Sequence, residues 1–297
     1  MFWKNFFYDL FRSPLILISF IIFFICLFVA IFAPYISPFN PWDPSSYDIF
    51  SSELPPIWKE GSDSQYILGT DLQGMDLLSA IFYGLRLSLF ISLTAIFVAV
   101  VVGTLLGMIA AWRGGWAETL IMRAVDIQLT FPAFMTAILV AGVIKTMLGT
   151  KPEPSYMIMV LIGSIAMSRW TNFARLARSS TLVEKNKEYV QSAKILGRSG
   201  TAILLRHILP NILGPLFIIM TIDLGVAITL EATLSFLGLG VPSTMPSLGT
   251  LIDSGRQVMR AKPWLLIYPT LTLTLLVVSV NLIGDFLRDS FNPEERG

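Results

Sequence analysis

Long runs of apolar residues dominate the pattern of hydrophobic and polar positions along this chain. A helix needs about 20 such residues to cross the hydrocarbon core of a bilayer. We therefore predict an all-α, polytopic transmembrane bundle with about six spans. The fourth candidate is short unless it continues through 170–182. The six candidate segments, some interrupted by Gly or Pro, are 15–33, 87–111, 127–144, 156–167, 212–230 and 264–283.

The polar stretches between these segments divide one predicted transmembrane domain, residues 1–297, into parts. The N-terminal span lies in 1–34, and a proline-rich, turn-forming segment follows in 35–85. A core region, 86–297, holds the other spans and one long basic loop, 168–211. Gly103 and Gly107 form a G-x-x-x-G pattern, which favours close packing of the second span.

Composition agrees with lipid as the solvent for much of the chain. Only 14% of the residues are charged and 54% are hydrophobic, with a net charge of +1. Soluble domains carry about 25% charged residues. The apolar content argues against disorder, and the balanced charge argues against nucleic-acid binding. A single cysteine, Cys26, excludes an internal disulfide, and a single histidine, His207, excludes multi-histidine zinc chemistry.

The distribution of basic residues predicts the orientation in the membrane. With six spans, both termini lie on one side, and that side holds 14 of the 21 Lys and Arg residues against 7 on the other. Positive residues are retained on the cytoplasmic side. We therefore expect both termini and the loop 168–211 in the cytoplasm, and the segment 35–85 on the extracytoplasmic side.

The basic loop contains the pattern of a short helix. Asn186 is a candidate cap, Glu188 lies in the first turn, and Gly197 is placed to end the helix in a left-handed conformation. A second helical stretch, 201–208, is expected to stop before Pro210.

Apolar residues at three-residue intervals, Val190, Ala193 and Leu196, form a narrow stripe on this helix. Such a stripe suits docking into a groove of another protein. The alternative is an amphipathic helix on anionic lipid, which the eight Lys and Arg residues of the loop also favour. Composition alone does not separate these two interpretations.

The same loop resembles the cytoplasmic signature of bacterial ABC importer permeases. That signature reads E-A-A, three residues, Gly, nine residues, Ile, any residue, Leu-Pro. The spacing is kept here, and three positions differ in chemistry. The matching residues are Gln191 for Glu, Ser192 for the first Ala, Ala193, Gly197, His207 for Ile, Leu209 and Pro210.

Further segments narrow the resemblance to dipeptide and oligopeptide permeases, and within them to the C-type subunit. Residues 68–76 read LGTDLQGMD, similar to L-G-T-D-x-x-G-R-D with Met75 in place of Arg. The pattern Y-G-x-R-x-S-L follows at 83–89. The remaining matches are 206–211, 231–240 and 281–289.

The resemblance implies a type I ABC importer permease fold in the bacterial inner membrane. It also implies the partners: a homologous B-type permease, two cytoplasmic ABC ATPases, an extracytoplasmic solute-binding protein and membrane lipid. ATP and Mg²⁺ would belong to the ATPases, with no cofactor in this chain. Related permeases serve dipeptides, longer peptides, nickel chelates or glutathione. The residues implied to transmit motion from the ATPase are Gln191, Ser192, Ala193, Gly197 and Pro210, flanked by Glu188, Tyr189 and Leu196.

The chain carries no P-loop motif, so we expect no ATPase activity of its own and assign no catalytic residue. Asp223 lies inside the fifth span, where an ionisable residue is costly and faces the bundle interior or a water path. It either lines the path or permease interface, or makes a structural hydrogen bond to a neighbouring helix. Glu231 is a second candidate for that path or interface, although interfacial water can solvate a residue so near a span end.

Two other classes of function fit the pattern. An ion-coupled secondary transporter or channel subunit would use a buried acid such as Asp223, although the inverted repeats that mark many such folds are absent. A membrane scaffold would recruit a cytoplasmic partner through 168–211 without moving a solute. Dependence of uptake on ATP or on an ion gradient distinguishes these classes.

Overall fold

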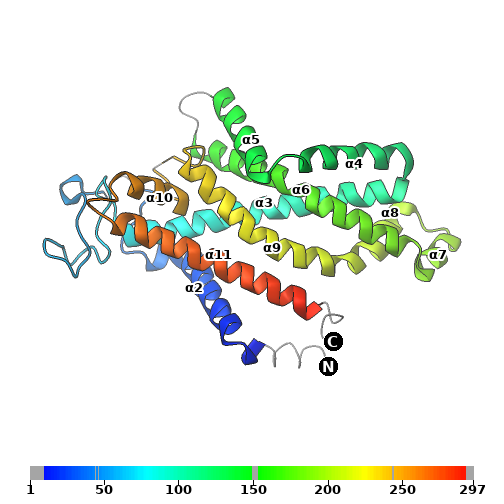
Figure 1. The fold of residues 1–297 in the computed structure, drawn as a ribbon, viewed down its shortest axis with the longest axis horizontal. Coiled ribbons are helices and arrows are strands. Elements are labelled where there is room, and N and C mark those ends of the chain that lie inside the picture. Colours follow the sequence, from blue (N-terminus) through cyan, green and yellow to red (C-terminus); the bar gives the residue numbers. More distant parts are fainter. Residues whose placement is uncertain (1–9, 44, 46, 149–152, 243, 292–297) are drawn as a thin grey trace.

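The structure is a computed structural model that describes residues 10–43, 45, 47–148, 153–242 and 244–291. Lys4, Lys151 and Arg296, which contribute to the predicted orientation, lie outside this part of the chain. Long helices lie side by side in a bundle, with shorter helices at its two ends (Figure 1). The helices are α2 (Pro14–Ile36), η2 (Ile49–Ser51), α3 (Leu77–Arg113), α4 (Gly115–Leu129), α5 (Ala133–Leu148), α6 (Pro154–Lys185), α7 (Glu188–Ile195), α8 (Gly200–Ile203), η3 (Leu204–Ile208), α9 (Leu209–Phe236), α10 (Leu248–Gln257) and α11 (Trp264–Phe291).

Within the described ranges, five helical segments are long and apolar enough to cross a membrane, or six if the bent pair α4 and α5 makes one span. This agrees with the predicted all-α bundle. The helix boundaries differ at two places. α3 begins at Leu77 rather than near residue 87, so the segment that precedes it is shorter than predicted. α6 runs without a break to Lys185, which confirms that the fourth span continues through 170–182.

The third predicted span, 127–144, is not one straight helix. α4 ends at Leu129, α5 begins at Ala133, and the two axes differ by 95°. Pro132 stands at the break, and a proline disfavours helical geometry in the residue that precedes it. The proline near the start of this segment therefore breaks the span instead of being accommodated within it.

The core of the bundle is the close pairing of α3 with α6. Gly103 and Gly107 lie against the backbone of α6 at Trp170 and Ala174, where a Cβ atom would collide with carbonyl oxygens. The predicted role of the G-x-x-x-G pattern in close packing is confirmed. The fully buried Phe173 on α6 fills the space beside these glycines.

The bundle has two distinct ends (Figure 1). At the end that we call the α7 end lie α7, α8 and the start of α9. At the opposite end, the α10 end, lie α10 and residues 37–76. The latter segment is tied down at both sides: Asp76 caps α3 by accepting from the backbone N of Ser79 at 2.9 Å, and Lys262 donates to the carbonyl of Glu53 at 2.7 Å.

Asp71 holds the turn before α3. Its carboxylate accepts hydrogen bonds from the backbone N atoms of Gln73 and Met75, both at 2.8 Å. Burial raises the pKa of Asp71, and these two backbone hydrogen bonds partly offset the rise. The motif that resembles the peptide-permease segment is therefore a built turn that leads into α3.

Candidate functional site

The candidate site is the segment between the ends of α6 and α9, residues 186–211, at the α7 end. Its start differs from the prediction, because Asn186 ends α6 instead of capping α7. The N-cap of α7 is Lys187, which makes no side-chain capping bond. Glu188 lies in the first turn as predicted, where its charge is favourable at the positive end of the helix.

The end of α7 is as predicted. Gly197 has φ +74°, a left-handed conformation that glycine adopts without steric cost. The backbone N of Gly197 bonds the carbonyl of Lys194 at 3.0 Å, and the N of Arg198 bonds that of Ala193 at 3.1 Å. This pair of bonds is a Schellman motif, which fixes the direction in which the chain leaves the helix.

The apolar stripe faces inward. Val190 and Ala193 are buried against the bundle, and their cluster includes Phe173, Ile203 and Ile208. The prediction that this stripe docks into another protein is wrong for these two residues, because their own bundle already covers them. Leu196 points the other way and is 80% exposed.

The outward surface of α7 is mixed in character. Ile195 is 86% exposed beside Leu196, and the predicted residues Glu188, Gln191 and Ser192 are exposed as well. Ile195 and Leu196 therefore form a small exposed apolar surface at the tip of a polar helix. Ile195 was not predicted, because it follows neither the three-residue stripe nor the family signature.

Polar contacts attach the start of α7 to α6 and α9. Glu184 of α6 accepts from Lys187 Nζ at 2.6 Å and from the hydroxyl of Tyr189. Asn211 of α9 donates to that hydroxyl at 3.2 Å. Burial and the adjacent Glu184 carboxylate raise the pKa of Tyr189 to about 12, so its hydroxyl stays a neutral donor.

Trp112, near the end of α3, anchors the other side of the segment. Lys185 and Lys194 lie over its ring, with Nζ atoms 5.6 and 5.3 Å from the centroid. Gly200 packs against the indole edge, where a Cβ would lie 2.7 Å from Nε1. Lys185 also donates to the carbonyl of Ala111 at 3.0 Å. α7 is thereby attached to α3 as well as to α6 and α9.

The helix after α7 does not stop before Pro210. α8 passes into η3, a π-helical turn, and η3 passes into α9, with Pro210 in the first turn of α9. Proline is tolerated there because the first N–H groups of a helix have no partner within it. The expectation of a helix end before Pro210 is therefore wrong, and the segment connects directly to a long span.

Asp223 is buried and bound from α6. Arg169 forms an ion pair with it, and Asn172 Nδ2 donates to Oδ2 at 3.2 Å. Of the two alternatives left open by the sequence, this contact supports the structural bond to a neighbouring helix. Two further ion pairs hold α4 to α6 and were not predicted: Glu118 with Arg178, and Asp126 with Arg175.

Glu231 is fully buried, so the expectation that interfacial water solvates it is wrong. Ser235 donates to its Oε1 at 2.7 Å, whereas Oε2 has no hydrogen-bond partner among the described residues. The side chain lies inside the fold.

Two protein families match parts of this chain. Residues 103–297 match the family described as "Binding-protein-dependent transport system inner membrane component". Residues 1–56 match "N-terminal TM domain of oligopeptide transport permease C". Together the two matches cover all of the candidate site and most of the remaining chain.

Several relatives match over nearly the full length. The dipeptide transport system permease protein DppC of Haemophilus influenzae is 38% identical over 94% of this chain and 90% of its own. The oligopeptide transport system permease protein OppC of the same organism is 35% identical over 96% and 86%. The glutathione transport system permease protein GsiD of Pectobacterium atrosepticum is 32% identical over 98% and 91%.

A solved structure shares the fold. A chain of the MetNI methionine ABC transporter in an inward-facing conformation superimposes with a TM-score of 0.55 at 18% identity, over 72% of this chain and 97% of its own. The type I importer permease fold expected from the sequence is confirmed at the level of the fold.

Proposed function

Because this chain belongs to the family of binding-protein-dependent transport system inner membrane components, a multi-pass inner-membrane family, we propose that it carries short peptides through the membrane as one of two permeases in an ATP-driven importer. A homologous B-type permease would complete the path. Two cytoplasmic ABC ATPases and an extracytoplasmic solute-binding protein would complete the assembly. ATP and Mg²⁺ would be bound by the ATPases alone.

The observation that carries this proposal is the construction of α7. The helix presents two exposed apolar side chains, Ile195 and Leu196, while three neighbouring elements hold its other face. A partner that binds the exposed tip and moves therefore displaces α3, α6 and α9 together. That is the requirement for coupling ATP-driven closure of a partner to rigid-body motion of the spans.

The predicted coupling residues take different parts in this surface. Glu188, Gln191, Ser192 and Leu196 face outward and are proposed to contact the ATPase. Tyr189 and Ala193 attach α7 to the bundle, Gly197 sets its exit, and Pro210 leads into α9. These four residues would act by positioning the contact, because their side chains or backbone bonds are engaged within the chain.

Short peptides are the proposed solute because relatives named for dipeptide and oligopeptide transport align over nearly the whole chain. A third relative is named for the transport of glutathione. Glutathione is a tripeptide and therefore belongs to the same chemical class. The ion-coupled alternative loses its main support, because Arg169 already neutralises Asp223. We propose that Asp223 stabilises the permease and that neither it nor Glu231 binds the solute.

The orientation is part of the proposal: the α7 end and both termini lie in the cytoplasm. Single cysteines at Ser192 and Ser64, introduced after replacing Cys26 by alanine, test it with a membrane-impermeant maleimide on intact spheroplasts. We expect labelling at position 64 only. Labelling at position 192 from outside contradicts the orientation.

The function is tested by purifying the tagged chain from its native membrane in mild detergent and identifying what accompanies it. We expect a second six-span permease and P-loop ATPases. The purified assembly, reconstituted with its binding protein into liposomes, should accumulate radiolabelled dipeptide only with MgATP. Uptake that follows a proton gradient and ignores ATP overturns the proposal, and so does recovery of the chain alone or as a homodimer.

A further inference from the structure

Arg86 is the one partly buried arginine among the described residues that has neither an ion pair nor a hydrogen bond. The other two partly buried arginines, Arg169 and Arg178, each bind a carboxylate. Arg86 instead lies over the ring of Trp42, with its guanidinium carbon 5.8 Å from the centroid. No Arg86 nitrogen is among the fully enclosed polar atoms, so the guanidinium stays accessible at the surface of the fold. Its donors are therefore available to an acceptor from outside the described part of the chain.

Trp42, which lies beside Arg86, also has a donor without a hydrogen-bond acceptor. Its indole Nε1 is enclosed and has no hydrogen-bond partner among the described residues. Trp42 is fixed in place by an edge contact with Tyr83, with ring centroids 5.0 Å apart. A donor and a cation without acceptors thus lie together beside α3.

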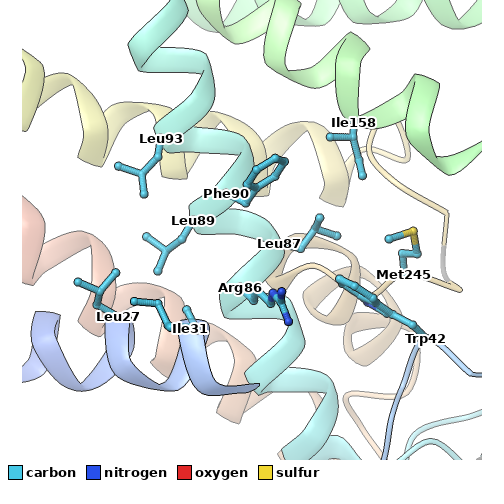
Figure 2. Close-up of a pocket in the computed structure, with 11 residues that line it drawn as sticks. Leu27, Ile31, Trp42, Arg86, Leu87, Leu89, Phe90, Leu93, Ile158 and Met245 are labelled. Carbon is cyan, nitrogen blue, oxygen red and sulfur yellow. The ribbon is translucent and has the colours of Figure 1, made fainter. Parts of the chain in front are cut away.

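A cavity of about 480 Å³ adjoins this pair (Figure 2). Leu27 and Ile31 of α2 form one wall, and Phe90 and Leu93 of α3 form another. Apart from Arg86 and the indole N–H of Trp42, the side chains that line the cavity are apolar. Ile31, Phe90 and Leu93 are 57%, 56% and 41% exposed, so the cavity opens on the lateral surface of the bundle.

The depth of Arg86 along α3 places it at the edge of the hydrocarbon core. α3 has 37 residues, which corresponds to about 55 Å, against a core of about 30 Å. A helix centred on the bilayer therefore extends about 12 Å beyond the core at each end. Arg86 is the tenth residue of α3, roughly 13 Å from its start, where lipid phosphates lie.

We propose that this cavity binds one phospholipid, preferably anionic, with its phosphate on Arg86 and one acyl chain between α2 and α3. The phosphate supplies the missing acceptor, and guanidinium groups bind phosphate oxygens in a charge-assisted, bidentate manner. The acyl chain fits an apolar wall that has no donor or acceptor for a peptide backbone. Trp42 would lie at the level of the headgroup, a position typical of tryptophan in membrane proteins.

The lining favours a lipid chain over a helix of a partner permease. Helix–helix contacts in membranes are rich in small residues. Ala30 is the only small residue in this cavity, and the rest of the lining is large. The groove between α3 and α6 shows the contrast, because Ala99, Gly163 and Ala166 lie along it. A partner helix is expected there rather than beside Arg86.

Native mass spectrometry of the purified full-length protein with its co-purifying subunits tests the proposal. Phosphatidylglycerol is titrated into wild type, Arg86→Met and Arg260→Met. Arg260 is an exposed arginine near the same end of the bundle and is the matched control. We expect Arg86→Met to weaken phosphatidylglycerol binding by about tenfold, the loss of one charge-assisted contact. Arg260→Met should leave it unchanged.

Further measurements separate the contribution of the lipid headgroup from that of the acyl chain. Diacylglycerol with the same acyl chains should bind wild type and Arg86→Met equally, and Leu93→Trp, which fills the cavity, should weaken both lipids. Inorganic phosphate should not compete. If Arg86→Met does not fold, Leu93→Trp and Arg86→Lys carry the test.

Equal phosphatidylglycerol binding by wild type and Arg86→Met overturns the proposal. Competition by inorganic phosphate overturns it as well, in favour of a simple anion site. Loss of the partner permease from Arg86→Met with unchanged lipid binding assigns Arg86 to a subunit interface instead.

Discussion

α7 and α10 are both short helices placed between longer ones, yet they are built in opposite ways. α10 begins with a capping box, in which Ser247 N bonds Thr250 Oγ1 at 2.8 Å and Ser247 Oγ accepts from Thr250 N at 3.3 Å. Its Leu248 and Leu251 are buried. α7 has no side-chain cap, and it ends with Ile195 and Leu196 in the open.

The difference agrees with the proposal that α7 contacts a partner, whereas α10 packs within this chain. α10 satisfies its end groups and buries its apolar side chains internally, so its contribution is to stability. α7 packs only one side against the bundle, and its large apolar side chains Ile195 and Leu196 stay exposed, where we propose that a partner covers them. Substitutions at α10 should therefore change folding, whereas substitutions at the tip of α7 should change transport.

The largest effect is expected at Gly255 in α10. A Cβ atom there would lie 2.5 Å from the carbonyl oxygen of Leu265, so Gly255→Leu forces backbone apart. We expect a loss of about 3 kcal/mol or more and little folded protein. The measurement is the monodisperse fraction after detergent extraction.

The control for Gly255→Leu is Gly214→Leu in α9, where an added Cβ meets nothing within 4 Å. This variant should fold normally. Normal extraction of Gly255→Leu contradicts the view that α10 is a packed structural helix.

The next effect concerns the tip of α7. Ile195→Asp and Leu196→Asp should reduce ATP-dependent uptake at least about tenfold, since a carboxylate at a buried contact costs more than the ~1.4 kcal/mol that a factor of ten represents. The free energy of unfolding should change by less than about 0.5 kcal/mol, because both positions are exposed.

The control Ile195→Leu keeps the surface apolar, so uptake should stay near the wild-type rate. Val190→Ala is the opposite control: it removes buried volume from the inner face of α7, so it should lower thermal stability. Uptake at the wild-type level in both aspartate variants excludes the tip of α7 as a contact with a partner.

Gly197 should show a smaller effect. Gly197→Val places a β-branched residue at φ +74°, which costs about 1–2 kcal/mol, while the added Cβ meets open space. We expect the protein to remain in the membrane at normal abundance and uptake to fall. Asparagine tolerates this conformation, so Gly197→Asn should lie near wild type. Equal uptake by the valine and asparagine variants removes the exit geometry of α7 from the mechanism.

The smallest effect is a pH dependence at the α10 end. Burial raises the pKa of Asp71, so the folded protein holds this proton more tightly than the unfolded chain. The contribution of protonated Asp71 to the stability of the fold is fully present below the pKa of the unfolded chain, and it is lost as pH rises through the pKa of the folded protein. Thermal unfolding measured from about pH 4 upward should show this dependence, and Asp71→Asn should reduce it by less than about 1 kcal/mol. Asp63→Asn, at an exposed acid of the same segment, should leave the profile unchanged.

The bundle was predictable because apolar length alone identifies a span. The end of α7 was predictable for a similar reason, since a glycine after a short amphipathic run needs no tertiary information. The break between α4 and α5 was not, because Pro132 is compatible with a kinked helix until the neighbouring helices fix the angle.

The short helix of the proposed site was predicted from the sequence, but the direction in which its apolar stripe faces was not. A stripe of Val190, Ala193 and Leu196 is apolar whether it faces the bundle or a partner, and only the packing of α7 decides. The anchoring role of Trp112 arises from contacts across more than 70 residues, which no local pattern contains. Asp223 was correctly read as a costly residue, but its partner Arg169 lies on another helix.

The cationic side chains of α6 bear on how the protein is made. Arg169, Arg175 and Arg178 are each paired with an acid from α9 or α4, so no acid within α6 itself balances them. α6 emerges from the ribosome after α4 but before α9. Until Asp223 is synthesised, Arg169 lacks its carboxylate, and α6 is a poor candidate to enter lipid alone. We therefore expect a chain truncated before Asp223 to integrate α6 into the membrane less efficiently than the full-length chain, because Arg169 would enter lipid without its carboxylate.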